Sequence, residues 1–444
     1  MGKTNLYDSS SIPKLIFNAC VPAVITTIIV TLYHIADTFF VGQTGNAMQV
    51  AAITLSGPVF SILSGIGTLI GSGGCAAIAM AFGKKDNEQI KKLSSFCFYS
   101  ALAVGILLAI GITIGMPYIL KILNVKPETN TYTKNYLQIS VLGCPFLLFS
   151  SVFANVVRGE GAIKESLLAN GIGSLAKIVL DPVLILIFNL GIIGAAIATI
   201  IGNMLSALYL ISFILSKKSQ LSVNIKYFSM KKNISLLILS LGLPTALGVA
   251  IQSIYGVVSN HVIGGYGDIA VAASGVSGKL GMMIAMVHIG ICMGIQPALA
   301  YNYGAGNIPR LLKIVKGTVF TTIGAGFLMS SVSWLMRSKF LSAFLQNSEV
   351  IAYGEILIFA GIITGPIIGL CYLSTSILQA TAKIKLATGN ALLRQGIFSI
   401  PLLIIFSKWI GLTGIVIAGV IVDIVAATIG ITICLLQLRG LKNH

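Results

Sequence analysis

The two halves of the chain repeat each other, with a repeat unit of about 221 residues. Pro22 matches Pro244 and Tyr33 matches Tyr255. The spacing drifts by a residue or two at most through the later matches: Gly42 with Gly264, Ser56 with Ser277, Gly83 with Gly304, Ile163 with Ile384, and Gly191 with Gly411. This period is far above the roughly 20 to 50 residues of solenoid or propeller repeats, so each half is expected to form a helical bundle of its own.

Each half contains six apolar stretches that are long enough to cross a bilayer. The chain is 56% hydrophobic and only 9% charged, and its mean hydropathy is +0.96, whereas a soluble domain has about 25% charged residues. An all-α integral membrane protein is therefore expected, and a repeated membrane bundle is typical of a transporter. Runs of about 20 apolar residues predict twelve transmembrane helices at 14–41, 51–82, 93–121, 132–157, 166–189, 192–215, 234–263, 271–302, 312–336, 350–379, 386–409 and 412–437.

The long polar segment at about 216–233 is basic and lies between the two halves. We therefore predict two domains, 1–220 and 221–444, which this segment joins as a cytoplasmic linker. Within the spans, the glycines between Ser64 and Gly74 recur at helical spacing, which predicts close packing of neighbouring helices. Prolines within the spans are expected to kink them.

The net charge of +17 is best explained by membrane topology. Most of the 29 Lys and Arg residues lie near the termini or in loops that follow even-numbered spans. The loops of the opposite side hold only these: Lys121, Lys126, Lys134, Arg337, Lys339 and Lys408. The positive-inside rule then predicts a multi-pass protein of the cell membrane with both termini in the cytoplasm. Because the basic residues are spread over every inner loop, no nucleic-acid partner is expected.

No metal or cofactor site is expected. The seven cysteines all fall within apolar spans, without a C-x-x-C pair or a nearby histidine, so they are interpreted as small core residues. The sequence also contains no G-x-x-x-x-G-K-[ST] loop for a nucleotide.

Two aspartates inside predicted spans give the sharpest functional signal. Asp37 lies near the outer end of the first span, and Asp181 lies about two turns from the outer end of the fifth. A charge inside a bilayer is costly unless it faces a cavity or a partner. Two carboxylates in one cavity are suited to exchanging protons, and they would also attract an organic cation or Na+.

Several motifs resemble the multidrug and toxic compound extrusion (MATE) family, in its bacterial and archaeal branch. In the first half these are Ala36-Asp37-Thr38-Phe39-Phe40-Val41-Gly42, Arg158-Gly159-Glu160-Gly161, Leu180-Asp181-Pro182, and the run from Gly191 to Thr199. In the second half they are Gln296-Pro297, Tyr301-Asn302-Tyr303-Gly304-Ala305-Gly306 and Leu393-Arg394-Gln395. Their order and spacing cover nearly the whole sequence.

The resemblance implies two pseudo-symmetric six-helix bundles around a central cavity that opens alternately to each side. It also implies secondary active transport, without enzymatic catalysis, in which amphipathic organic cations leave in exchange for H+ or Na+. Asp37 and Asp181 match acidic positions of the family's N-terminal lobe, and Thr199 matches a position near that ion site. The lipid bilayer is the expected surrounding, and a closed pair of bundles is expected to work as a monomer.

Lys177 departs from the family pattern, which commonly has Asn four residues before the aspartate of the fifth helix. At this spacing its ammonium can lie against the Asp181 carboxylate. A fixed cation there would compete with Na+, so we favour H+ as the coupling ion and expect Asp37, Asp181, Lys177 and Thr199 to form the coupling site. Proton exchange by Lys177 itself remains a second possibility.

The second half does not repeat this acidic site, since Asp37 matches Ser259 and Asp181 matches Pro401. Arg394 and Asp423 can instead form an ion pair inside the membrane. The candidates for a substrate cavity or a polar site of the C-terminal lobe are Tyr33, Gln252, Tyr255, Asn260, Lys279, Arg394 and Asp423.

Two other classes of function were weighed. The segment Gly265-Tyr266-Gly267-Asp268 fits the G-x-G-D pattern of intramembrane aspartyl proteases, but it falls in a short turn and has no second membrane aspartate beside it. A flippase of lipid-linked precursors, or an exporter of an anionic or zwitterionic metabolite, is the stronger rival. Lys177, Lys279 and Arg394 would then bind the anionic group.

Overall fold

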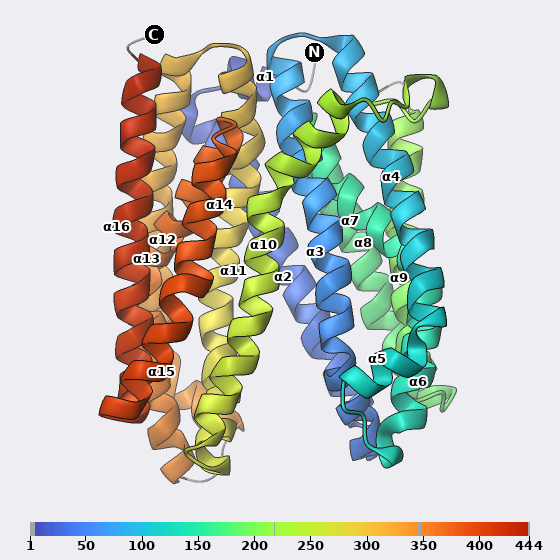
Figure 1. The fold of residues 1–444 in the computed structure, drawn as a ribbon, viewed down its shortest axis with the longest axis vertical. Coiled ribbons are helices and arrows are strands. Elements are labelled where there is room, and N and C mark those ends of the chain that lie inside the picture. The colour runs from blue at the N-terminus through green and yellow to red at the C-terminus, as the bar shows by residue number, and fades with distance from the viewer. Residues whose placement is uncertain (1–4, 217, 345–347, 443–444) are drawn as a thin grey trace. The chain divides into compact units, whose positions relative to one another are not determined.

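The regular structure of the chain is helical throughout the described residues, 5–216, 218–344 and 348–442, of a computed structural model (Figure 1). The first half contains α1 (Asn5–Asp8), α2 (Ile12–Gly42), α3 (Ala47–Gly83), α4 (Asn87–Ile114), α5 (Met116–Ile122), α6 (Pro127–Leu142), α7 (Cys144–Gly159), α8 (Ile163–Pro182), the π-helix η1 (Val183–Ile187) and α9 (Ile192–Leu215). After a short 3-10 helix, η2 (Ile225–Tyr227), the second half contains α10 (Lys232–Gly264), α11 (Asp268–Gly304), α12 (Ile308–Phe344), α13 (Ser348–Ala380), α14 (Ile384–Leu392), the π-helix η3 (Leu393–Phe398), α15 (Ser399–Ile410) and α16 (Leu412–Lys442). Lys217 of the predicted linker lies outside the described residues.

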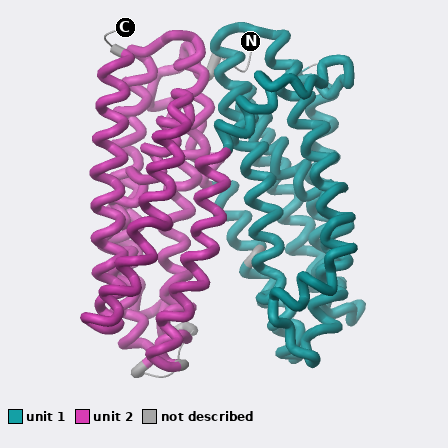
Figure 2. Tube along the Cα trace, viewed as in Figure 1, with its two compact units in different colours: residues 1–6, 25–242 teal, residues 7–24, 243–444 magenta. Residues whose placement is uncertain are grey.

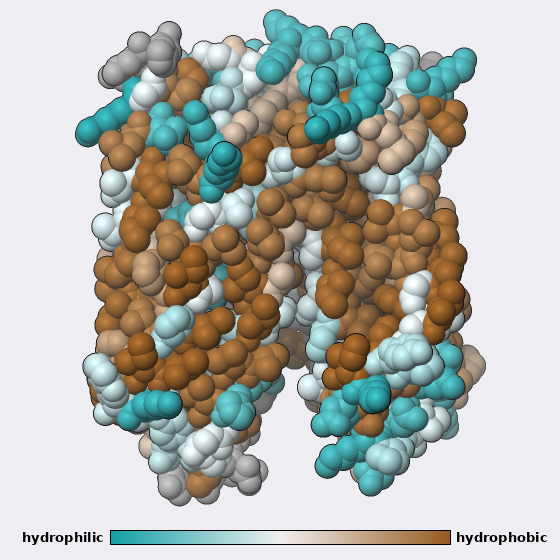
Figure 3. All heavy atoms as spheres, in the orientation of Figure 1, coloured by the Kyte–Doolittle hydropathy of each residue, from teal (hydrophilic) through white to brown (hydrophobic). Residues whose placement is uncertain are grey.

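The prediction of an all-α membrane protein with twelve spans is confirmed. Among the described residues, 11 helices are long and apolar enough to cross a membrane, and the bent pair α6 and α7 brings the number to 12. On the visible face of each unit, hydrophobic side chains form a broad band with hydrophilic residues at both ends (Figure 3). This is the surface that a bilayer requires, because its core solvates apolar side chains.

Two of the predicted spans are divided into two helices. The third breaks at Gly115, where Pro117 stands in the first turn of α5. The fourth bends by 56° between α6 and α7, where Pro145 stands in the first turn of α7. Proline has no backbone N–H, so it fits the first turn of a helix, where that donor has no intrahelical partner, and a new helix begins at each site.

The fifth span of each half contains a π-helical turn. In the first half η1 follows directly after Asp181 and Pro182, and in the second half η3 separates α14 from α15 and contains Arg394. A π turn adds a residue to the helix and rotates the side chains that follow, and such turns are frequent at functional sites. Both halves therefore place an ionisable side chain beside an irregular turn.

The chain forms two compact units (Figure 2). Unit 1 consists of Met1–Leu6 and Ile25–Gly242, and unit 2 consists of Tyr7–Val24 and Leu243–His444. The unit boundaries thus fall inside α1, α2 and α10. The predicted domain limits at 220 and 221 stay a prediction, since compactness of the folded chain does not locate the boundary of a sequence repeat.

The segment that follows α9 is held against unit 1 by hydrogen bonds to its backbone. Ser95 Oγ donates to the carbonyl oxygen of Ser222 at 2.9 Å, and Tyr99 Oη donates to that of Val223 at 2.9 Å. The buried Glu160 carboxylate accepts from Gln220 N at 2.6 Å. These contacts satisfy peptide groups that no regular structure pairs, and they make the segment an ordered part of unit 1.

Candidate functional site

Unit 1 contains a buried cluster of three ionisable side chains. Lys177 Nζ lies 3.1 Å from Asp37 Oδ2, and the two side chains are only 6% and 8% exposed. Asp181, one turn further along α8, is fully buried, and neither of its carboxylate oxygens accepts a hydrogen bond from a described residue. Lys177 and Asp37 both interact electrostatically with Asp181. The structure thus brings together the three charged residues of the predicted coupling site.

The Lys177 ammonium pairs with Asp37 and not with Asp181, which its spacing along the helix had made a possible partner. The ion pair joins Lys177 to Asp37 on α2, and no ion pair joins it to Asp181 among the described residues. The spacing of i and i+4 permits a contact along one helix but does not enforce it. A long lysine side chain reaches the neighbouring helix equally well, where Tyr33 offers a second attraction.

Aromatic rings complete the surroundings of the cluster. Lys177 Nζ lies 4.9 Å from the centre of the Tyr33 ring, within the range of a cation–π interaction. Tyr136 on α6 is buried and interacts electrostatically with Asp37, Asp181 and Tyr33. Sequence analysis missed Tyr136, because a neutral aromatic in an apolar span carries no signal that separates it from core residues.

Glycines let the helices that carry these residues approach closely. A Cβ on Gly202 of α9 would lie 2.6 Å from the Gly173 carbonyl oxygen and 3.5 Å from Lys177 Cβ. Contact at 2.6 Å is impossible for a real side chain, so the approach of α8 to α9 requires glycine at this position. The α8 backbone that carries Lys177 is therefore packed directly against α9.

A polar cavity of about 230 Å³ adjoins the cluster within unit 1. Tyr33, Lys177 and Thr199 all line it. Thr199 Oγ1 donates to the carbonyl oxygen of Ala195 at 2.9 Å, and Asn203 Nδ2 donates to the carbonyl oxygen of Thr199 at 3.0 Å. Side-chain hydroxyls and amides therefore line the same cavity as Lys177, and they can exchange hydrogen bonds with water or a ligand.

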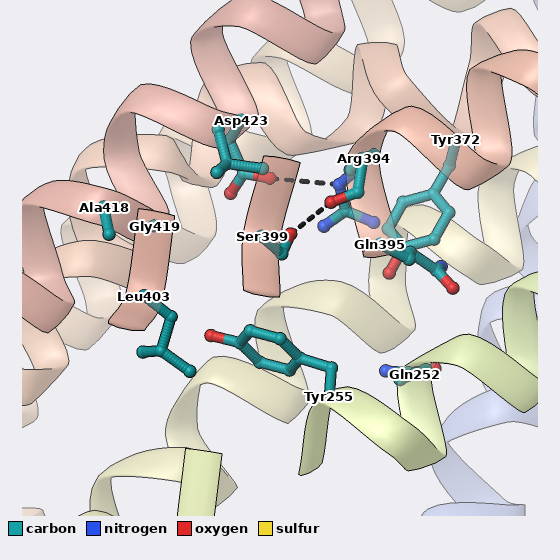
Figure 4. Close-up of a pocket in the computed structure, with 11 residues that line it drawn as sticks. Gln252, Tyr255, Tyr372, Arg394, Gln395, Ser399, Leu403, Ala418, Gly419 and Asp423 are labelled. Atoms are coloured by element: carbon teal, nitrogen blue, oxygen red, sulfur yellow. Dashed lines mark hydrogen bonds and ion pairs between the residues drawn. The ribbon is translucent and has the colours of Figure 1, made fainter. Parts of the chain in front are cut away.

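Unit 2 contains a second charged pocket, of about 170 Å³ (Figure 4). Arg394 Nε donates to Asp423 Oδ1 at 3.0 Å, and the guanidinium carbon lies 4.6 Å from the centre of the Tyr372 ring. The Arg394 and Asp423 side chains are 15% and 14% exposed. The ion pair that the sequence allowed is thus present, and an aromatic ring on α13 supports it.

The other residues predicted for the second half are divided between lining and surface positions. Gln252 and Tyr255 of α10 line the unit 2 pocket, whereas Asn260 and Lys279 are exposed and do not line it. Tyr33 lines the cavity of unit 1. Polarity along a span does not show which of its residues line a pocket, because that depends on how the span packs against neighbouring helices.

The two pockets occupy equivalent positions in the two repeats. Tyr33 in one corresponds to Tyr255 in the other, and Asn203 corresponds to Asp423. Ser151 lines the unit 1 cavity, and Tyr372, its counterpart in the repeat, lines the unit 2 pocket. The repeat alignment could therefore have identified Tyr372, but only after one of the pockets was known.

Neither pocket has the composition of a transition-metal centre. Among the described residues, no group of three or more His, Cys, Asp or Glu side chains is placed to hold a metal ion, and each cysteine is free and buried. The pockets are lined instead by Lys177 in unit 1, by the Arg394–Asp423 pair in unit 2, and by hydroxyls and amides in both.

Known proteins are similar to this chain over most of its length. The family model MatE matches residues 22–183 and 244–405. "Multidrug export protein MepA" of Staphylococcus saprophyticus subsp. saprophyticus is 28% identical, covering 95% of this chain and 93% of the relative. The protein of the same name from Staphylococcus aureus (strain MSSA476) is 31% identical, covering 92% of this chain and 90% of the relative.

Solved structures show the same fold. One of them, described as the outward-facing conformation of a multidrug resistance MATE family transporter of the MOP superfamily, matches with a TM-score of 0.94 and 22% sequence identity. The match covers 100% of this chain and 99% of the other.

Proposed function

Since the chain belongs to the MATE family, we propose that it exports amphipathic organic cations from the cell in exchange for protons. Relatives that bear the name of multidrug export proteins align over nearly the whole chain, which supports export of drug-like molecules. Exchange for a second ion, in the manner of a secondary transporter, is consistent with ionisable groups buried inside membrane spans.

One observation carries the choice of H+ over Na+: the Lys177 ammonium lies 3.1 Å from the Asp37 carboxylate inside a buried cluster. Sodium binding at this carboxylate would require the ammonium to be displaced or two cations to share one small site. Like charges this close repel strongly where the dielectric constant is low. Asp181 can still take up a proton, since its oxygens accept no hydrogen bond from a described residue.

The charges of the cluster support exchange through Asp181. The Lys177 and Asp37 charges cancel, so an ionised Asp181 leaves one uncompensated negative charge in a buried place, which is costly. A bound proton removes that charge, and an organic cation nearby also compensates it. The proton and the organic cation thus compete for the same carboxylate, which is the requirement for antiport.

Alternating access then needs only that the two ligands favour different conformations. A ligand shifts a conformational equilibrium by its difference in affinity for the two states, and the coupling between two ligands is reciprocal. The ion pair between Lys177 on α8 and Asp37 on α2 links the two helices, and Asp181 lies one turn from Lys177 on α8. Protonation of Asp181 changes the electrostatic attraction between these helices, so the helices are the elements we expect to rearrange.

We place both termini in the cytoplasm and the protein in the cell membrane. Lys and Arg are concentrated at the ends of the chain and in the loops that follow even-numbered spans. Such a bias sets the orientation of membrane proteins.

Proton release on substrate binding tests the proposal. The purified protein is placed in weakly buffered detergent solution with a pH indicator, and a lipophilic cationic dye is added. The wild type is expected to release protons as the dye binds, and Asp181→Asn is expected to release none. Glu165→Gln, on the same helix but hydrogen-bonded to Tyr209, serves as the control and is expected to match the wild type. Equal release from Asp181→Asn and the wild type would contradict the proposal.

A further inference from the structure

The proton exchange proposed for the unit 1 cluster does not use the charged pocket of unit 2. Its positive and negative charges, Arg394 and Asp423, come from η3 and α16 and meet at 3.0 Å. Tyr372 supports the guanidinium from α13 (Figure 4). Three separate helical elements thus contribute to one ion pair inside a membrane bundle. In the repeat, Arg394 corresponds to Gly173 and Asp423 to Asn203, which line the unit 1 cavity.

Both members of the pair keep capacity for further hydrogen bonds. The bond between them uses Nε of Arg394 and Oδ1 of Asp423. A guanidinium has five N–H donors, and a carboxylate has a second oxygen with its own lone pairs. Nearby, Oε1 of Gln395 lines the pocket and is buried without a hydrogen bond from any described residue. Such an acceptor is costly to leave unpaired, and a donor on a ligand would satisfy it.

The pocket suits a small ligand with an apolar part. Its volume of about 170 Å³ is below the range of roughly 300 to 1,000 Å³ that is usual for drug-sized ligands. Leu403, Ala418 and Val422 are buried residues that form an apolar side of the pocket. The polar side holds the ion pair, with the amides of Gln252 and Gln395.

Charge balance decides the class of ligand. Arg394 and Asp423 together carry no net charge. A ligand with a single charge would bring an uncompensated charge into a buried site, whereas a zwitterion adds none. A zwitterion can also place each of its charges beside the opposite charge of the pair, so that four charges alternate in sign.

We propose that this pocket is a second ligand site of the transporter, and that it binds a small zwitterion of the amino-acid type. The ligand carboxylate accepts hydrogen bonds from the terminal N–H groups of Arg394, and the ligand ammonium donates to Asp423. An aliphatic side chain packs against Leu403, Ala418 and Val422. This assignment deepens the proposed function, because it gives the exporter a substrate class besides organic cations.

Calorimetric binding to the purified full-length protein tests the site with three probes of similar shape. L-leucine carries both charges, leucine methyl ester carries only the ammonium, and 4-methylpentanoate carries only the carboxylate. Leucine is expected to bind at least about tenfold more tightly than either analogue, since each analogue leaves one buried charge without its partner. Equal affinity for leucine and an analogue, or no binding of leucine, would overturn the proposal.

Variants locate the binding. Arg394→Gln and Asp423→Asn are expected to weaken leucine binding at least about tenfold, but each also breaks the ion pair and can impair folding. Gly419→Leu leaves the pair intact and fills the pocket, because a Cβ on Gly419 meets only Ala360 Cβ, at 3.9 Å. It is expected to abolish leucine binding, while Gly389→Ala, at an open position outside the pocket, is expected to have no effect. Unchanged leucine binding by Gly419→Leu would overturn the site.

The same samples separate this proposal from the proposed function. Release of protons on addition of a cationic dye reports on the unit 1 cluster. Dye-induced release without leucine binding would reject the zwitterion site alone, and leucine binding without dye-induced release would reject the proton exchange alone.

Discussion

Lys177 is the residue on which the account of ion coupling depends. Its ammonium and the Asp37 carboxylate are 3.1 Å apart and almost fully buried, so each compensates the charge of the other. Removing one partner of a buried pair leaves the other uncompensated, whereas replacing both by uncharged groups is often neutral. The pair can therefore be tested through stability without any transport assay.

We predict that Lys177→Met lowers the free energy of unfolding by about 3 kcal/mol, and that the double variant Asp37→Asn with Lys177→Met recovers most of this loss. Thermal unfolding in detergent gives the order of the three proteins. Glu355→Gln is the control, because its pair with Arg337 is long, at 4.0 Å, and partly exposed, and such pairs contribute at most about 1 kcal/mol. A double variant as unstable as the single one would contradict the pairing.

Charged residues of the unit 1 cluster and of the unit 2 pocket could be predicted from the sequence, and their uncharged neighbours could not. Asp37, Asp181, Arg394 and Asp423 stand out because an ionisable residue is costly within an apolar span. Tyr136 and Tyr372 have the same polarity as many packed aromatics, so only their surroundings identify them. The partner of Lys177 depends on tertiary contact between α2 and α8, which spacing along one helix cannot determine.

At the scale of single elements, α3 shows how glycine permits helix contact. A Cβ on Gly73 would collide with the carbonyl oxygen of Ile238, and a Cβ on Gly242 would collide with that of Leu69. These paired contacts bring the first turns of α10 against α3 within unit 1. They agree with the interpretation of the glycine run as a packing surface.

We predict that Gly73→Ala destabilises the protein by about 1–3 kcal/mol, because the helices must separate to admit the methyl group. Gly65→Ala is the matched control on the same helix, since a Cβ there meets nothing within 4 Å. The midpoint of thermal unfolding in detergent distinguishes them. Equal midpoints for the two variants would show that the close approach is not required.

The ordered segment after α9 gives a second prediction for an element. Tyr99→Phe removes the hydrogen bond to the Val223 carbonyl oxygen, a loss of about 1 kcal/mol that raises the population of the released segment about fivefold. Tryptic cleavage after the exposed Lys226 should accelerate accordingly. Tyr118→Phe, at an exposed position on α5, should leave the cleavage rate unchanged. If both variants are cleaved at the wild-type rate, the bond does not hold the segment.

The number of transmembrane spans was predicted correctly from the sequence, but the positions where two of them break were not. Hydropathy identifies twelve spans because a bilayer requires about 20 apolar residues for each. The break at Gly115 and the bend between α6 and α7 follow from Pro117 and Pro145, which begin new helices. Prolines also occur inside continuous helices, as Pro22 and Pro58 do here, so proline alone does not predict which span divides.

At the scale of the whole molecule, one repeated bundle provides two pockets with different charges. Asn203 in unit 1 corresponds to Asp423 in unit 2, and Gly173 in unit 1 corresponds to Arg394 in unit 2. Duplication of the fold therefore did not duplicate the site chemistry. The two proposals, proton exchange in unit 1 and binding of a zwitterion in unit 2, both depend on this difference in charge.

Transport of a lipophilic cationic dye in proteoliposomes tests the central claim most directly, with the wild type and Lys177→Asn compared under an imposed pH gradient and then under an imposed Na+ gradient at equal pH. The account predicts that the pH gradient alone drives the wild type, and that Lys177→Asn gains a response to Na+ because the fixed ammonium no longer occupies the site. Transport by the wild type under the Na+ gradient alone, or the same ion dependence in both proteins, would contradict it.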